Sequence, residues 1–165
     1  MLEQRKIDLS NYFNCLDKLN IDCIETYDLK CKNNLPCEIG IYKDKILNNK
    51  DVEEFISKIG ILEEKKLSSN VDDMKSILGT ARLEMIKNHN SVTEFLTPIS
   101  KLDFKNFIEK YISYDDIIMI NLNINHIIEV SQVYENETSI LPEYDQTVIL
   151  TTIDEIFWIG IFYPM

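Results

Sequence analysis

Acidic and aromatic side chains gather in one stretch near the end of the chain. The segment YENETSILPEYDQ and the two acids that follow it supply the candidate partner-binding residues, which are Tyr134, Glu135, Glu137, Glu143, Tyr144, Asp145, Asp154 and Glu155. In an extended chain, carboxylates two positions apart, such as Glu135 and Glu137, point to the same side. Such pairs can ligate a hard cation such as Mg²⁺ or Ca²⁺, or they can form a solvated acidic loop.

Metal, cofactor and catalytic chemistry lack a supporting pattern. The chain has no DxDxDG calcium loop, and no two of its four glycines are closer than 19 positions, which excludes a glycine-rich phosphate loop. His89 and His126 belong neither to an HExxH zinc motif nor to a GxSxG nucleophile motif. We therefore predict no cofactor, no metal and no catalytic residue. An active site assembled from distant carboxylate, thiol or imidazole groups is the alternative.

The four cysteines predict buried thiols. Cys15, Cys23, Cys31 and Cys37 are separated by seven, seven and five residues. Structural zinc sites usually contain pairs with about two to four residues between the ligands. Disulfides are rare in a reducing cytosol, where cysteine often packs as a small apolar residue.

Three aromatic residues accompany the acids. Tyr134 and Tyr144 flank the polar loop, so an interface role and a core role are equally compatible with their positions. Trp158 lies inside EIFWIGIFYP, a run that is apolar on both faces. This pattern predicts that Trp158 is in the core of a central strand.

Helical periodicity dominates the first two thirds of the chain. Apolar residues recur at helical spacing in four segments, at 9–19, 52–59, 71–85 and 104–111. Gly60 is a natural C-terminal position for the second helix. The third segment is the longest helix that we expect.

Alternating apolar residues dominate the last third. We predict strands at 118–124, 128–130, 148–150 and 155–164, and a hairpin earlier in the chain from 21–23 and 37–41. The fold class is therefore α+β, with about four helices mostly in residues 8–112 and an antiparallel sheet mostly from the C-terminal third. The length and the absence of a repeat or flexible linker predict a single domain over residues 1–165.

The charge of the chain is unevenly distributed. The formal net charge is -11, with 28 acidic residues against 17 basic ones. Residues 111–165 hold nine acids and no lysine or arginine, whereas residues 1–110 have a net charge of only -2. This distribution argues against direct binding of nucleic acid or of an anionic membrane, because both require a basic surface. It favours a cationic partner, or no partner at all if the acidity serves only solubility.

The first residues lack the apolar run of a signal peptide, and no apolar stretch reaches the length of a membrane span. We therefore expect a cytoplasmic protein.

The preferred hypothesis is a small acidic inhibitor that covers a basic site on a partner protein, such as a toxin or a nucleic-acid-handling enzyme. Immunity proteins and nucleic-acid mimics share this charge profile. The alternatives are a small-molecule enzyme and an accessory subunit that pairs through its C-terminal strand, with Phe157, Trp158 and Phe162 as contacts.

Overall fold

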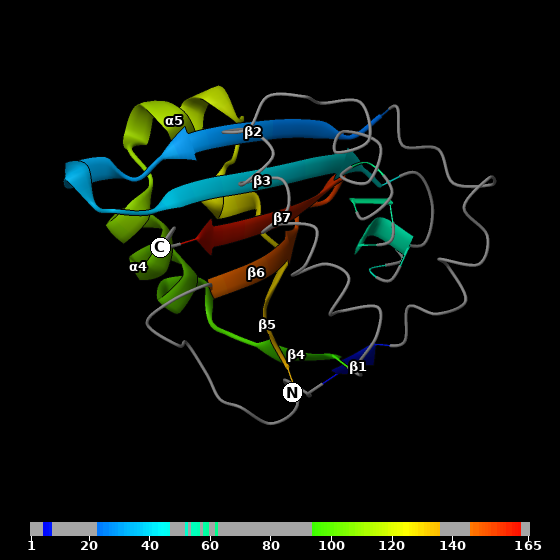
Figure 1. Cartoon of the computed structure of the whole chain (residues 1–165). Coiled ribbons are helices and arrows are strands. Elements are labelled where there is room, and N and C mark those ends of the chain that lie inside the picture. Colours follow the sequence, from blue (N-terminus) through cyan, green and yellow to red (C-terminus); the bar gives the residue numbers. More distant parts are fainter. Residues whose placement is uncertain are drawn as a thin grey trace.

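Seven strands form one antiparallel sheet in the computed structural model of the chain (Figure 1). The strand order is β1-β4-β5-β6-β7-β3-β2. The strands are β1 (Arg5–Ile7), β2 (Glu25–Lys30), β3 (Glu38–Lys45), β4 (Glu94–Pro98), β5 (Glu129–Glu135), β6 (Gln146–Thr151) and β7 (Glu155–Phe162). The structure describes residues 5–7, 23–46, 52, 54–56, 58–59, 62, 94–135 and 146–162.

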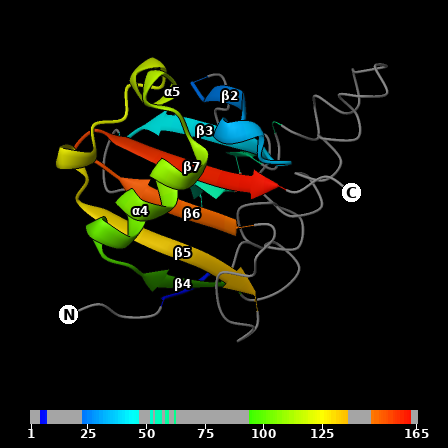
Figure 2. The same cartoon turned by 90° about the vertical axis from the view of Figure 1, so that its left-hand side faces the viewer.

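Helical segments cover both faces of this sheet. The helices α4 (Lys101–Tyr111) and α5 (Tyr114–Met119) lie on one face, which Figure 2 shows from the front. Helical residues between Val52 and Leu62 lie on the other face, to the right of the sheet in Figure 1. The predicted helix at 52–59 is confirmed in its described residues, and Leu62, beyond the predicted end at Gly60, is helical as well.

Strand β7 divides the apolar core into two parts. Phe157, Ile159 and Ile161 pack on the face of α4 and α5, whereas Ile156 and Trp158 pack on the opposite face. Because successive side chains of a strand point to opposite faces, a run that is apolar at every position needs a cover on both sides. The predicted central position of this strand, between β6 and β3, and the burial of Trp158 are confirmed.

The predicted hairpin is present as β2 and β3, although its first strand begins at Glu25, later than predicted. A short 3-10 turn, η2 (Lys32–Asn34), joins the two strands. The prediction of buried thiols was wrong here, because Cys31 and Cys37 are buried but form a disulfide across the loop. The register brings these two residues opposite each other, with the Cys31 amide donating to the Cys37 carbonyl. Cys23 is exposed, and Cys15 lies outside the described residues.

Helix α4 agrees with the prediction for 104–111. Ser100 caps its first turn, with its Oγ accepting a hydrogen bond from the Asp103 amide at 3.0 Å. Phe104, Ile108 and Tyr111 follow at helical spacing and are buried against the sheet.

The strand predicted at 118–124 is wrong, because this segment begins in helix α5. Ser113 caps α5 by accepting a hydrogen bond from the Asp116 amide. The helix is followed by its cap residue Ile120 and then by Asn121, whose φ of 56° is left-handed, and the Leu122 amide donates to the Ile117 carbonyl. This is a Schellman-type end, in which the two residues joined by that bond also share the apolar core. A second 3-10 turn, η3 (Ile124–His126), then leads to β5.

The fold class is α+β, but two details of the prediction are corrected. The sheet is not restricted to the C-terminal third, because β1, β2, β3 and β4 all precede residue 100. In the part of the chain that the structure describes, helix occurs in three places rather than about four: α4, α5 and the described residues among 52–62. The predicted helices at 9–19 and 71–85, and the predicted strand at 21–23 except for Cys23, lie outside that part. Within it, no helix has both the length and the apolar character that crossing a membrane requires.

Candidate functional site

The turn between β6 and β7 places two of the predicted binding residues, Asp154 and Glu155. Thr152 organises the turn, because its Oγ1 contacts the Asp154 carboxylate at 3.2 Å and accepts a hydrogen bond from the Glu155 amide at 3.1 Å. The Asp154 carbonyl also accepts a hydrogen bond from the Ile46 amide at 2.8 Å. The turn is therefore attached to the end of β3, and it exposes the Asp154 side chain while Glu155 turns inward.

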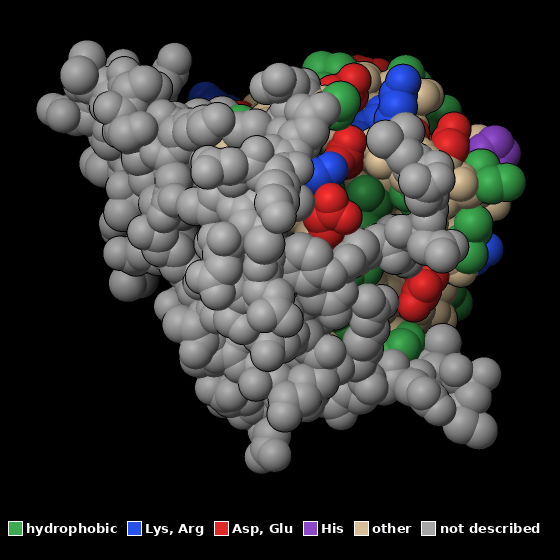
Figure 3. All heavy atoms as spheres, turned by 90° about the vertical axis from the view of Figure 1, so that its right-hand side faces the viewer, with side chains coloured by type: hydrophobic (Ala, Val, Ile, Leu, Met, Phe, Trp, Pro, Cys, Tyr) green, Lys and Arg blue, Asp and Glu red, His purple; other side chains and the backbone are tan. Residues whose placement is uncertain are grey.

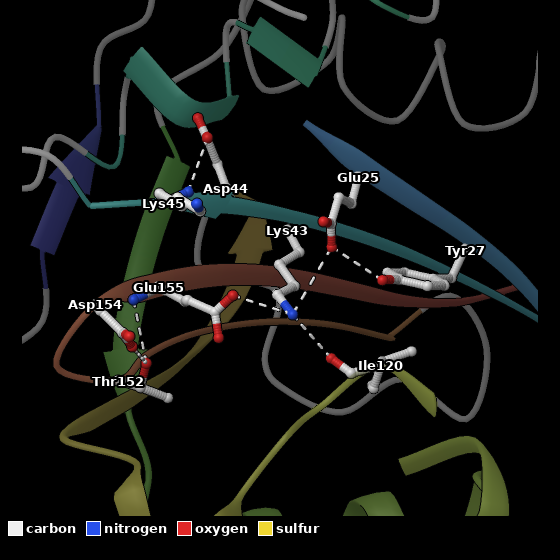
Figure 4. A network of polar contacts seen from close by, with 9 residues as sticks. All are labelled: Glu25, Tyr27, Lys43, Asp44, Lys45, Ile120, Thr152, Asp154 and Glu155. Carbon is white, nitrogen blue, oxygen red and sulfur yellow. Dashed lines mark hydrogen bonds and ion pairs between the residues drawn. The ribbon is translucent and has the colours of Figure 1, made fainter. Parts of the chain in front are cut away.

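Glu155 belongs to a polar cluster centred on Lys43, in the middle of Figure 4. The Lys43 Nζ lies 3.0 Å from the Glu155 carboxylate and donates to the Ile120 carbonyl at 3.1 Å. It also lies 3.8 Å from the Glu25 carboxylate and 5.4 Å from the centre of the Phe157 ring. Only 9% of the Lys43 side chain is exposed, so this ammonium is satisfied by protein groups rather than by bulk water.

Tyr27 extends the cluster along β2. Its hydroxyl donates to the Glu25 carboxylate at 2.9 Å. The pKa of Tyr27 is raised above its ordinary value of 10.0 by burial first, then by the hydrogen bond to Glu25 and by the negative charges of Glu25 and Glu155. All of these effects favour the neutral phenol, which is the form that can donate the hydrogen bond.

Asp44, the next residue of β3, points to the opposite face of the sheet (Figure 4). Its carboxylate forms an ion pair with Lys58 at 3.3 Å and accepts a hydrogen bond from the Lys45 amide at 2.8 Å. Lys58 comes from the helical residues on that face. Adjacent residues of one strand therefore connect the sheet electrostatically to a helical segment on each side.

The four predicted binding residues that the structure describes lie in two separate places. Tyr134 and Glu135 are the last residues of β5, whereas Asp154 and Glu155 lie at the β6–β7 turn. The register pairs Glu129 with Thr151, so the turn adjoins the start of β5. Glu135 is therefore about 20 Å away along the strand. Glu137, Glu143, Tyr144 and Asp145 lie outside the described residues.

Large apolar side chains are exposed close to the described acids. Tyr114, Ile118 and Met119 are exposed on α5, next to the exposed Asp115. Ile153, 81% exposed, precedes Asp154 in the β6–β7 turn. Ile128 is exposed as well, and it lies next to this turn because its amide donates to the Thr151 carbonyl. Figure 3 shows hydrophobic and acidic side chains next to each other on the part of the described surface that is visible at its right.

The C-terminal strand, which the accessory-subunit hypothesis pairs with a partner's sheet, already has a neighbouring strand of this chain on each side. Strand β7 is paired along its length with β6 on one side and with β3 on the other. Phe157 and Trp158 are fully buried, and Trp158 packs edge-on against Tyr42 with their ring centres 5.3 Å apart. These residues therefore stabilise the core of the sheet.

No group of three or more histidine, cysteine, aspartate or glutamate side chains that could hold a metal ion occurs among the residues whose structure is described. The carboxylates of Glu25 and Glu155 do converge, but the ammonium of Lys43 lies between them.

Lys43, Glu25 and Tyr27 were not among the predicted site residues. A signal for Lys43 was present, because it continues the alternation Ile39, Ile41, Lys43 on the inward face of a strand. A charged residue at such a position needs a buried partner. The identity of that partner is not encoded locally, since Ile120 is 77 residues away.

The antiparallel sheet with helical segments on both faces defines the chain as an α+β protein. In comparisons with protein-family models, with curated proteins and with solved structures, the chain shows no significant similarity to any of them.

Proposed function

We propose that this protein binds a basic partner protein and covers a basic site on it. One observation carries the proposal: the same part of the chain supplies the excess of negative charge and the exposed apolar side chains. Residues 111–165 contain no lysine or arginine. They also provide five of the six large apolar residues that are exposed in the described part of the structure, namely Tyr114, Ile118, Met119, Ile128 and Ile153.

The combination is more informative than either property alone. Acidic residues by themselves increase solubility, and single exposed apolar residues are common on protein surfaces. Apolar side chains within an acidic surface can serve as anchors that are desolvated on binding, while the carboxylates accelerate encounter with a positively charged partner. Two clusters fit this description: the α5 cluster of Tyr114, Asp115, Ile118 and Met119, and the turn cluster of Ile128, Ile153 and Asp154.

The class of partner follows from the charge. Enzymes that handle polyanions, such as nucleases, present basic sites, and a negatively charged protein can occupy such a site. An inhibitor or immunity-type protein in the cytoplasm is the role that we propose. In this compartment the pair Cys31 and Cys37 would meet a reducing environment. Acid quenching of intact cells, followed by unfolding, alkylation of free thiols and mass spectrometry, tests the location, because unfolding exposes these two buried sulfurs. Complete protection of both sulfurs would indicate an oxidising compartment instead.

Affinity capture from the source cells over a salt series tests the binding function. A basic protein should be recovered, and its association rate should fall steeply as the salt concentration rises. Two charge-reversal variants then locate the surface. One carries Asp115→Lys and Asp154→Lys at the described clusters, and the other carries Glu137→Lys, Glu143→Lys and Asp145→Lys. Glu109→Lys, on the exposed side of α4 and before the acidic segment, is the matched control.

The first variant should slow association by roughly tenfold or more, whereas the control should change it by no more than about twofold. A large effect of only the second variant would assign the interface to the segment between β5 and β6 in the sequence. Unchanged association rates in both variants would overturn the proposal. Ile118→Ser and Ile153→Ser should mainly accelerate dissociation, because they remove desolvated anchors rather than charge.

A further inference from the structure

Lys43 contacts both segments that carry the exposed apolar side chains. Its ammonium binds the carbonyl of Ile120, which is the residue at the C-terminal end of α5. The same ammonium binds the carboxylate of Glu155, the first residue after the β6–β7 turn. In Figure 4 the Lys43 side chain extends from β3 between these two groups. A single buried cation thus connects the α5 cluster with the turn cluster.

Helix α5 depends strongly on such external contacts. It has six residues, which is far too short for a helix to be stable without tertiary packing. On its inner side it is held by Ile117, Ile120 and Leu122, which belong to the core. Its last carbonyl groups cannot bond within the helix, and the negative end of the helix dipole lies there. The Lys43 ammonium supplies a donor and a compensating positive charge at this point.

The turn cluster depends on the same cation in another way. Only 18% of the Glu155 side chain is exposed. Without Lys43 this carboxylate would have to move toward water, because a poorly solvated charge without a partner is costly. Such a movement would pull on the backbone next to Asp154 and Ile153, which the Thr152 hydrogen bonds now hold.

We infer that Lys43 is a positioning residue, which fixes α5 against the start of β7 so that the two clusters form one preorganised binding surface. The role of that surface rests on the proposed function, but the positioning itself can be measured without any partner.

Amide hydrogen exchange of the purified protein, followed by mass spectrometry of peptides, tests the positioning. Lys43→Met keeps most of the length of the side chain and removes the charge. We expect exchange in residues 114–122 and 153–156 to accelerate by roughly tenfold or more, with much smaller changes in β5 and β6. Lys43→Arg restores a positive charge and should return the exchange part of the way to that of the parent protein.

Lys58→Met is the matched control, because it removes the ammonium that pairs with Asp44 on the opposite face of the sheet. It should accelerate exchange around residues 52–62 and leave 114–122 within about twofold of the parent. If Lys43→Met does not fold, Glu155→Gln is the second variant. It leaves the Ile120 contact in place, so it should accelerate exchange in 153–156 and change 114–122 much less.

Two results would overturn the inference. One is exchange in 114–122 that stays within about twofold of the parent in a folded Lys43→Met protein, or exchange in 153–156 that does so in Glu155→Gln. The other is an equal acceleration in every peptide, which would mean that Lys43 contributes only to global stability.

The partner recovered by capture provides a separate measurement. Lys43→Met should increase the dissociation rate constant several-fold and leave association nearly unchanged, because the exposed carboxylates are still present. Recovery of no basic partner would defeat the proposed function but leave the exchange result valid. Conversely, normal binding with unchanged exchange would defeat the role of Lys43 alone.

Discussion

Lys43 and Asp44 are adjacent on β3 and carry opposite charges to opposite faces of the sheet. On the face of α4 and α5, Lys43 is surrounded by two carboxylates, a helix-terminal carbonyl and an aromatic ring. On the other face, Asp44 pairs with Lys58 and with the amide of Lys45. The comparison teaches that the two charges differ in reach: the ion pair of Asp44 joins one helical segment that is also packed through Phe55 and Ile56, whereas the partners of Lys43 belong to separate segments.

The largest effect on stability is expected from removal of the Lys43 charge, which has more partners than the Asp44 charge. Lys43→Met should lower the free energy of unfolding by about 2–4 kcal/mol, because Glu155 and the Ile120 carbonyl lose their partner. Urea denaturation measures this value. The double variant Lys43→Met with Glu155→Gln should regain part of the loss. If the two single effects simply add, the pair is not coupled and the comparison with Asp44 loses its basis.

The disulfide provides a second constraint on the same face, because Cys31 and Cys37 belong to the core beneath α4 and α5. Replacing both by serine should cost about 2 kcal/mol through the greater entropy of the opened loop. Thermal unfolding with and without a reductant measures this cost. Reductant should destabilise the parent protein and have no effect on the double variant. If the double serine variant also weakens the ion pair of Asp44 with Lys58, the two faces of the sheet are not independent.

The charge on the opposite face should matter less. Asp44→Asn should cost about 1–2 kcal/mol, because Lys58, although only 18% exposed, has a long side chain that can carry its ammonium to water when its partner is lost. The exposed pair Lys105 and Glu109 on α4 provides the baseline, and Lys105→Met should change stability by no more than about 0.5 kcal/mol. Chemical denaturation under identical conditions compares them. A cost for Asp44→Asn equal to that of Lys43→Met would remove the ranking of the two faces.

The smallest effect concerns alkaline pH. Because the pKa of Tyr27 is raised in the folded protein, the unfolded chain loses this proton first as the pH rises above 10.0. The folded state then holds more protons, so stability decreases with pH until the folded phenol also ionises. The contribution is fully present below the unfolded pKa. Tyr27→Phe should remove this part of the alkaline loss, and denaturation between about pH 9 and pH 11 measures it. An identical slope in the variant would mean that Tyr27 is not responsible.

Several elements were predictable because their signal is local. The strands around 128–130 and 148–150 show apolar alternation, the strand from 155 shows a continuous apolar run, and α4 shows helical spacing behind a serine cap. The error at 118–124 has a local explanation too. Ile118, Ile120 and Leu122 alternate as in a strand, but Ser113 and Asp116 form the S-x-x-D pattern of a helix start. The capping bond and the left-handed Asn121 decide in favour of the helix.

The candidate site was predictable only as a distribution of charge. The acidic character of residues 111–165 follows from composition, so it required no coordinates. The composition did not reveal which of these acids are exposed. Asp154 faces solvent and the next residue, Glu155, faces Lys43, because alternate positions near the start of a strand point in opposite directions.

The sequence by itself determined the class of fold, the central apolar strand and the lopsided charge, since each depends on residue types and short-range periodicity. Tertiary structure alone decided which charges meet. Lys43 reaches Glu155 and Ile120 only because the sheet places β3 beside β7 and α5 across them. Contacts between residues more than 70 positions apart depend on strand order and register, and these arise from packing of the whole chain.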